Sequence, residues 1–155
     1  IEEFDADSKP RSVWVTGHSL GGALATITAA KMIEDDDPIH GMYTYGQPRV
    51  GDRKFAREFD GEFESRAFRH VNSHDIVTRV PPRRSPGGDR YRHIGSLKYF
   101  DAAGDLHDDI NWWNWFLSVF RHDFDSLRDQ LGHPFSDHNI DRYVALLKAL
   151  AERDS

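Results

Sequence analysis

Apolar and polar residues alternate along the chain in two patterns, one typical of strands and one of helices. Short apolar runs bounded by turn residues predict strands, and apolar residues at helical spacing predict helices. In chain order, the expected elements are a buried strand at 12–16, a helix from 20 to about 33, a strand at 40–45, a short helix ending at 59 and a strand at 66–72. This order is typical of right-handed βαβ units, so we expect an α/β fold with a mostly parallel sheet.

Helix boundaries are indicated by polar residues. Asp52 is a suitable N-cap for the short helix. The first helix carries an approximate apolar stripe made of Leu20, Leu24, Ile27 and Ile33. The acidic run 34–37, followed by a proline, is expected to end it.

The second half of the chain predicts one more strand and two more helices. The strand is expected at 91–100, and the last helix has an apolar stripe formed by Ile140, Tyr143, Val144, Leu147 and Leu150. Between them, residues 111–121 hold three of the four tryptophans, placed on one helix face. We interpret this face as packing on the sheet. The alternative is an acyl-chain wall or a lipid-facing surface, because tryptophan combines an apolar ring with a polar N–H.

Composition narrows the classes of protein. The 155 residues are expected to form a single domain, 1–155. A net charge of −6 argues against nucleic acid as a partner. The chain has no cysteine, which excludes disulfides, thiol catalysis and cysteine-ligated zinc. No apolar run approaches the roughly 20 residues of a membrane span. We therefore expect a soluble protein, and no signal peptide is visible to decide between secretion and the cytoplasm.

The most informative segment is Gly17-His18-Ser19-Leu20-Gly21, a G-x-S-x-G sequence between the first strand and the first helix. In a nucleophile elbow, the serine stands at the tip of a strained turn, free of the sheet. Side chains two residues to either side are expected to collide there, which explains both glycines. The N–H groups at the start of the helix face negative charge that develops on a substrate. The alternative is an ordinary glycine-rich strand–helix turn.

A nucleophilic serine needs a histidine and a carboxylate as partners. Asp75 lies just beyond the carboxyl end of the parallel strand that we expect at 66–72. His138 stands at the entry to the last helix, and the order Ser, Asp, His is that of α/β-hydrolases. The competing histidines near these motifs are His18, beside the serine, His74, beside the aspartate, and the nearest rival, His133.

Several segments resemble the class 3 lipases, the fungal-type triacylglycerol lipase family. VTGHSLGGALA at 15–25 resembles the family's nucleophile motif, and the other matching segments are 43–59, 70–82, 91–100 and the Asp-His pair at 137–138. The resemblance implies an α/β-hydrolase that cleaves acylglycerols or other esters at a lipid–water interface. It implies a Ser19, Asp75 and His138 triad that works through an acyl-enzyme, a backbone N–H of Leu20 as one oxyanion donor, and no cofactor or metal.

Two features depart from the family pattern. An α/β-hydrolase sheet has several strands before its elbow, and an earlier loop supplies half of the oxyanion hole. Only 12 residues precede Val13, so we expect the N-terminal half of the domain to be absent and the chain alone to be slow and prone to self-association. Thr78 stands where the family commonly has proline, which is expected to soften the loop after Asp75.

Other readings of the sequence stay open. The chain would also fit an inactive lipase fragment that binds lipid or a partner chain, or a transferase or protease with the same triad. A basic patch on this acidic chain consists of Arg79, Arg83, Arg84, Arg90 and Arg92. We interpret it as solvated surface. The alternative is attraction of fatty-acid or phospholipid charge.

Overall fold

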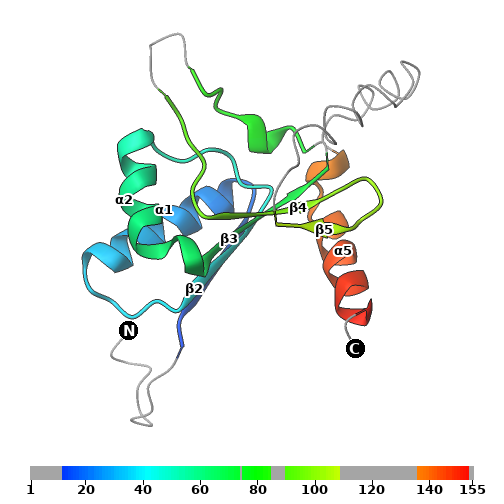
Figure 1. Ribbon diagram of the computed structural model, residues 1–155, viewed down its shortest axis with the longest axis horizontal. Helices are drawn as coiled ribbons and strands as arrows, with labels where there is room; N and C mark the ends of the chain where they lie inside the picture. Colours follow the sequence, from blue (N-terminus) through cyan, green and yellow to red (C-terminus); the bar gives the residue numbers. More distant parts are fainter. Residues whose placement is uncertain (1–11, 74, 85–89, 109–135, 154–155) are drawn as a thin grey trace.

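A computed structural model describes residues 12–73, 75–84, 90–108 and 136–153 (Figure 1). Predictions for the first eleven residues, for the tryptophan helix at 111–121, for His74 and for His133 lie outside the described residues. The described elements are β1 (Trp14–His18), α1 (Leu20–Glu34), β2 (Gly41–Tyr45), α2 (Arg53–Phe63), η2 (Glu64–Arg66), β3 (Ala67–Asn72), η3 (Val77–Arg79), β4 (Ser96–Phe100), β5 (Leu106–His107), η4 (Ser136–His138) and α5 (Ile140–Arg153).

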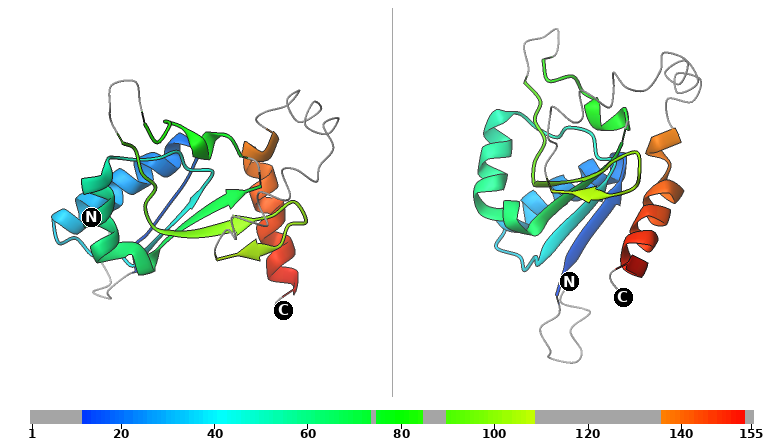
Figure 2. Two further views of the ribbon diagram at one scale, coloured as in Figure 1. Left: turned by 45° about the horizontal axis from the view of Figure 1, so that its top comes forward. Right: turned by 45° about the vertical axis from the view of Figure 1, so that its right-hand side comes forward.

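The strands form one sheet in the order β1-β2-β3-β4-β5. β1 to β4 are parallel, and β5 is antiparallel to β4. Helices α1 and α2 cover one face of this sheet and α5 lies against the other (Figures 1 and 2). The expected parallel βαβ arrangement is confirmed. Because the strands are parallel, their carboxyl ends meet at one edge of the sheet.

Small residues hold α1 close to the sheet. Its buried positions are Gly22, Ala25, Thr26 and Ala29. Of the apolar stripe predicted for this helix, Leu20, Leu24 and Ile27 point outward and are 67%, 56% and 54% exposed, whereas Ile33 packs against the core. A Cβ at Gly22 would lie 3.1 Å from Cβ of Gln47, so larger side chains on this face would push the helix away.

The expected burial of the first strand was wrong for the described residues. Trp14 is 54% exposed and no residue of β1 is buried. The reason is that β1 pairs only with β2 within the described sheet. The strand expected at 91–100 is also shorter, since only Ser96–Phe100 forms β4.

Asp52 caps α2, as predicted. Its Oδ1 accepts hydrogen bonds from the backbone N–H groups of Lys54 and Phe55, both at 2.9 Å. The helix ends at Phe63, beyond the predicted end at 59, because Phe59 and Phe63 both pack into the core under the sheet. Among the described helices, none combines the length and the apolar content needed to cross a membrane.

His70 of β3 predicts how stability depends on pH. Its buried ring stacks on Tyr45 with centroids 4.8 Å apart, and burial lowers its pKa to about 4. In the unfolded chain, a histidine titrates near pH 6.5. Between these values the unfolded chain binds a proton that the folded chain does not, so the free energy of unfolding falls as pH falls.

We expect acidification from pH 7 to about 4 to remove up to about 3 kcal/mol through this group. Urea unfolding at several pH values measures the loss, and His70→Gln should make the pH dependence shallower. His40→Gln, which replaces an exposed histidine, is the control. Equal pH slopes in His70→Gln and the wild type would contradict this assignment.

Candidate active site

Ser19 stands alone between β1 and α1 in a strained backbone conformation. Its φ is 57° and its ψ is −128°, values that a residue with a side chain rarely adopts. The turn is anchored by a 3.0 Å hydrogen bond from the Ser19 N–H to the carbonyl oxygen of Tyr45. This is the geometry expected of a nucleophile elbow.

The glycines around Ser19 differ in how much space their positions leave for a side chain. A Cβ at Gly17 would lie 2.2 Å from the carbonyl oxygen of Gly21, so no side chain fits there. A Cβ at Gly21 would meet no described atom within 4 Å, so the collision expected at this position was wrong. The second crowded glycine is Gly22, which lies between Gln47 and the carbonyl of Gly17.

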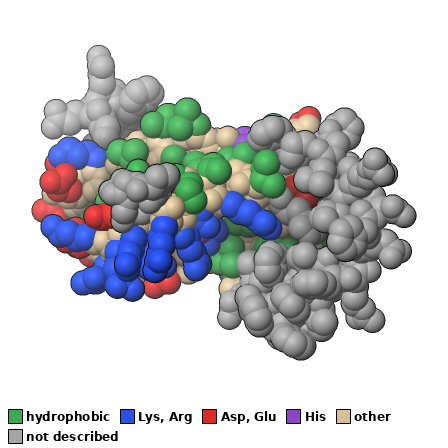
Figure 3. Space-filling model, turned by 90° about the horizontal axis from the view of Figure 1, so that it is seen from above, with side chains coloured by type: hydrophobic (Ala, Val, Ile, Leu, Met, Phe, Trp, Pro, Cys, Tyr) green, Lys and Arg blue, Asp and Glu red, His purple; other side chains and the backbone are tan. Residues whose placement is uncertain are grey.

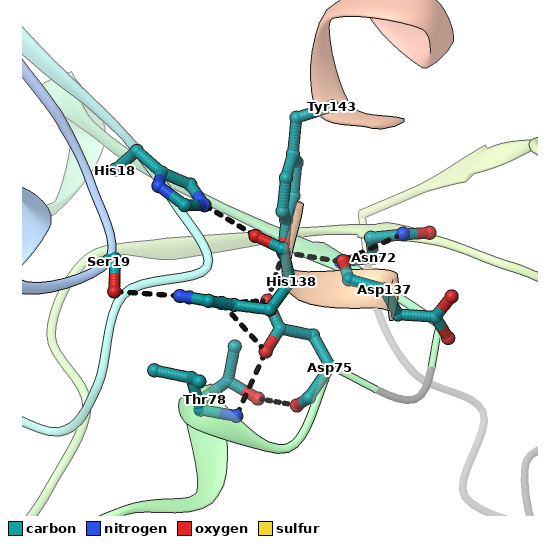
Figure 4. A network of polar contacts seen from close by, with 9 residues as sticks. His18, Ser19, Asn72, Asp75, Thr78, Asp137, His138 and Tyr143 are labelled. Atoms are coloured by element: carbon teal, nitrogen blue, oxygen red, sulfur yellow. Dashed lines mark hydrogen bonds and ion pairs between the residues drawn. The ribbon is translucent and has the colours of Figure 1, made fainter. Parts of the chain in front are cut away.

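The structure brings together the three residues that the sequence singled out (Figure 4). Nε2 of His138 lies 2.7 Å from Oγ of Ser19. On the other side of the ring, Nδ1 lies 3.0 Å and 3.1 Å from the two carboxylate oxygens of Asp75. The side chain of Asp75 is fully buried and that of His138 is 14% exposed. The imidazole of His138 therefore lies between the hydroxyl of Ser19 and the carboxylate of Asp75, within hydrogen-bonding distance of both.

The Asp75 carboxylate has further donors that fix it. The backbone N–H of Val77 donates to Oδ1 at 2.9 Å, and the hydroxyl of Tyr143 donates to Oδ2 at 2.7 Å. The loop itself is held by the hydroxyl of Thr78, which donates to the backbone carbonyl of Asp75 at 2.8 Å. Thr78 was expected to soften this loop, but its hydrogen bond ties the loop to the aspartate.

Three residues around the triad were missed or given another role by the sequence analysis. Tyr143 was predicted only as part of an apolar stripe. Besides donating to Asp75, its hydroxyl accepts a hydrogen bond from the backbone N–H of Asn72 at 3.0 Å. The amide of Asn72 donates to the carbonyl of Asp137 at 3.0 Å, beside the histidine. His18 was expected only beside the serine's backbone. Its Nε2 in fact lies 2.7 Å from the carbonyl oxygen of His138, and the two rings pack with centroids 4.6 Å apart.

The surroundings of Tyr143 shift the pKa of its hydroxyl. Burial, together with the charge of Asp75 and the hydrogen bond to it, raises the pKa of Tyr143 well above its ordinary value. The tyrosine therefore stays protonated at neutral pH, and its hydroxyl donates to the Asp75 carboxylate.

Gly46 leaves room for the Asp–His contact. It has a φ of +58°, and a Cβ there would lie 2.7 Å from Oδ2 of Asp75 and 2.9 Å from Nδ1 of His138. The residue follows β2, and its N–H donates to the carbonyl of His70 at 3.0 Å. Any side chain at this position would separate the two partners.

The backbone N–H groups at the start of α1 lie next to Ser19. Leu20 is the first residue of α1, so its N–H has no acceptor within the helix. Ser19 makes no side-chain capping bond to these groups. Within the described ranges, no cluster of three or more histidine, aspartate or glutamate side chains is arranged to hold a metal ion.

Comparison with known proteins agrees with this arrangement. The family model for lipase (class 3) matches residues 1–85, more than half of the chain. The chain belongs to the class 3 lipase family. Its elbow, with Ser19 at the tip, and the loop that carries Asp75 both fall inside the matched residues.

Two of the similar curated proteins are lipases. A secreted mono- and diacylglycerol lipase of Fusarium solani is 47% identical over 95 residues, which cover 61% of this chain and 26% of that protein. A triacylglycerol lipase of Nicotiana tabacum is 38% identical over 96 residues, which cover 57% of this chain and 16% of that protein.

Solved structures agree in fold. A mono- and diacylglycerol lipase from Aspergillus oryzae superposes with a TM-score of 0.56 at 27% identity, covering 65% of this chain and 35% of that one. Lipase II from Rhizopus niveus gives a TM-score of 0.55 at 30% identity, covering 65% of this chain and 37% of that one. The α/β-hydrolase fold is therefore confirmed. The chain spans little more than a third of these structures and about a quarter or less of the two curated relatives.

The hydrogen bonds of the Tyr143 hydroxyl lead us to expect that removing it lowers the stability of the fold. Tyr143→Phe removes a donor to a buried carboxylate and the acceptor of the Asn72 N–H, and we expect the free energy of unfolding to fall by about 1.5–3 kcal/mol. Urea unfolding measures the change. Tyr43→Phe is the matched control, because no hydrogen bond of the Tyr43 hydroxyl occurs within the described residues. A loss of the same size in both variants would show that the hydroxyl of Tyr143 holds nothing in place.

Proposed function

We propose that this chain hydrolyses carboxylic esters of acylglycerols with Ser19 as nucleophile. One observation carries the proposal: His138 lies within hydrogen-bonding distance of both Oγ of Ser19 and the carboxylate of Asp75. The names of the relatives, mono- and diacylglycerol lipase and triacylglycerol lipase, support the substrate class.

The reaction follows from the positions of these atoms. Oγ of Ser19 attacks the ester carbonyl while Nε2 of His138 takes its proton, and Asp75 orients the ring and stabilises the imidazolium. The Leu20 N–H donates to the oxygen that becomes negatively charged. His138 then protonates the leaving alcohol. Water, activated by the same ring, cleaves the acyl-enzyme and releases the fatty acid and free Ser19.

We also propose that residues 1–155 belong to one α/β-hydrolase domain. Supporting this, Ser19 and His138 lie far apart in the sequence and meet at one sheet edge. The strand before the serine, β1, belongs to the sheet, and the helix after the histidine, α5, lies against this same sheet (Figure 2).

Single substitutions test the roles. Ser19→Ala and His138→Ala should each remove nearly all ester turnover, because the three residues act as a unit. Asp75→Asn should lower kcat by about 10⁴-fold, by analogy with a serine protease triad. The rate of hydrolysis of a short-chain soluble ester and of a diacylglycerol measures the effect.

A second Asp–His pair offers a matched control. Oδ2 of Asp101 lies 2.9 Å from Nε2 of His107 at the surface, and Asp101 follows β4, which β2 and β3 separate from β1. Asp101→Asn should therefore leave turnover close to that of the wild type. Near-normal turnover in Asp75→Asn, or equal losses in both asparagine variants, would mean that Asp75 does not serve the histidine. Faster cleavage of an amide than of the matching ester would argue for a protease instead.

A further inference from the structure

The elbow contains one polar side chain that the proposed reaction does not use. His18 is the last residue of β1 and stands directly before Ser19. The G-x-S-x-G pattern leaves this position open, since neither the turn nor the nucleophile requires a particular side chain there. The structure gives the histidine a partner, because its Nε2 lies 2.7 Å from the carbonyl oxygen of His138 (Figure 4). A carbonyl oxygen only accepts, so Nε2 of His18 carries the hydrogen and donates it.

The carbonyl of His138 lies outside the helix that follows it. Asn139 caps α5, because its carbonyl accepts the N–H of Arg142 at 3.1 Å and its Oδ1 accepts the N–H of Asp141 at 2.9 Å. The first hydrogen bond of a helix is accepted by the carbonyl of its N-cap residue. The His138 carbonyl comes one residue earlier, beyond the hydrogen bonds of α5. His18 therefore supplies a donor to a carbonyl that the helix itself does not use.

Side chains of the sheet hold both peptide groups that flank the α-carbon of His138. On one side, the amide of Asn72 in β3 donates to the carbonyl of Asp137 at 3.0 Å. On the other side, His18 in β1 donates to the carbonyl of His138 itself. Each peptide group is planar, so holding both carbonyls sets the backbone dihedral angles of His138 and the direction in which its side chain leaves the backbone. This support matters because η4 is a 3-10 helix of only three residues.

His18 and Ser19 contact opposite ends of one residue. Oγ of Ser19 lies 2.7 Å from Nε2 of His138, and the ring of His18 lies 2.7 Å from the carbonyl of that same histidine. The two histidine rings pack with centroids 4.6 Å apart, and the ring of Tyr143 meets His18 edge-on at 5.8 Å. In the view from above, the described histidine side chains reach the surface only in a small patch beside hydrophobic ones (Figure 3). Water therefore has little access to compete for the hydrogen bond.

We propose that His18 is a positioning residue for the triad: by holding the carbonyl of His138, its N–H sets the distance between Nε2 of that histidine and Oγ of Ser19. The proposal rests on the proposed function, which makes His138 the base. A misplacement of reacting groups by about 1 Å costs about 10²-fold in rate. Loss of the N–H should lower kcat and leave KM near its original value, because the proton transfer is affected and the binding of the ester is not.

Two substitutions separate the N–H of His18 from its ring. His18→Gln keeps an N–H donor at a similar distance from the backbone and removes the ring, whereas His18→Phe keeps a flat ring and removes the donor. We expect His18→Phe to lower kcat for a soluble short-chain ester by roughly tenfold to hundredfold, and His18→Gln to retain most of the turnover. His40→Phe is the matched control, because His40 is exposed and stands before β2, at the opposite end of the strands.

Nuclear magnetic resonance reports the position of His138 without turnover. In a chain labelled with ¹⁵N-histidine, the hydrogen between its Nδ1 and the carboxylate of Asp75 should give a signal far downfield, and Asp75→Asn identifies this signal by its loss. We expect the signal to shift or broaden in His18→Phe and to stay in place in His18→Gln and His40→Phe. If phenylalanine prevents folding, His18→Leu removes the donor with a smaller side chain.

The results that would overturn the proposal are distinct. Normal turnover in His18→Phe with a loss in His18→Gln would mean that ring packing, and not the N–H, places the base. Equal losses of kcat in the two variants, or a rise in KM alone, would also overturn it. An unsubstituted chain without ester turnover contradicts the proposed hydrolysis instead, and the response of the His138 signal to the two substitutions then still decides whether His18 positions that ring.

Discussion

A buried carboxylate holds the described structure together at its functional edge. An ionised group taken out of water must find donors in the protein, or the cost of its desolvation falls on the folded state. Asp75 finds them in three different segments: the backbone after β3, the imidazole of η4 and the phenol of α5. Satisfying one charge therefore fixes how the C-terminal helix meets the sheet.

The parallel sheet makes this convergence possible. Ser19 follows β1, Gly46 follows β2 and Asp75 follows β3, so three consecutive strands deliver them to the same edge. The serine comes from the strand–helix turn with a strained backbone, whereas Gly46 contributes only the space that its missing side chain leaves. The site is thus built as much from backbone geometry as from reactive side chains.

Local signals in the sequence were sufficient to predict the elbow and the start of α2. The G-x-S-x-G segment predicted the elbow at Ser19, and Asp52 predicted the start of α2, because turns and caps depend on neighbouring residues alone. Ser19, Asp75 and His138 were chosen from their positions at element ends together with the resemblance to class 3 lipases. The three side chains lie together in the structure, and their catalytic roles stay a prediction. Tyr143 was missed because a tyrosine at helical spacing among apolar residues has the same pattern as ordinary core.

The outward Leu and Ile side chains of α1 show a second limit. A stripe of large apolar residues usually marks the packed face of a helix. Here the fully buried positions of α1 are glycine, alanine and threonine, and Leu20, Leu24 and Ile27 face outward, while Ile33 near the end of the helix packs against the core. The exposure of Trp14 was missed for a related reason: how many neighbours a strand has is a long-range property, and its composition does not record it.

The docking of α5 has a consequence for how the molecule responds to heat. Among the described residues of this helix, only Tyr143 is buried, while Ile140 and Val144 are each 41% exposed. Segments with few buried contacts open locally at a lower free energy than the core that they cover. Because His138 lies just before α5, a partial opening of this one helix separates His138 from Ser19 and Asp75 while the strands keep their pairing. The contacts of His138 with Ser19 and Asp75 are then expected to be lost at a lower free energy than the pairing of the strands.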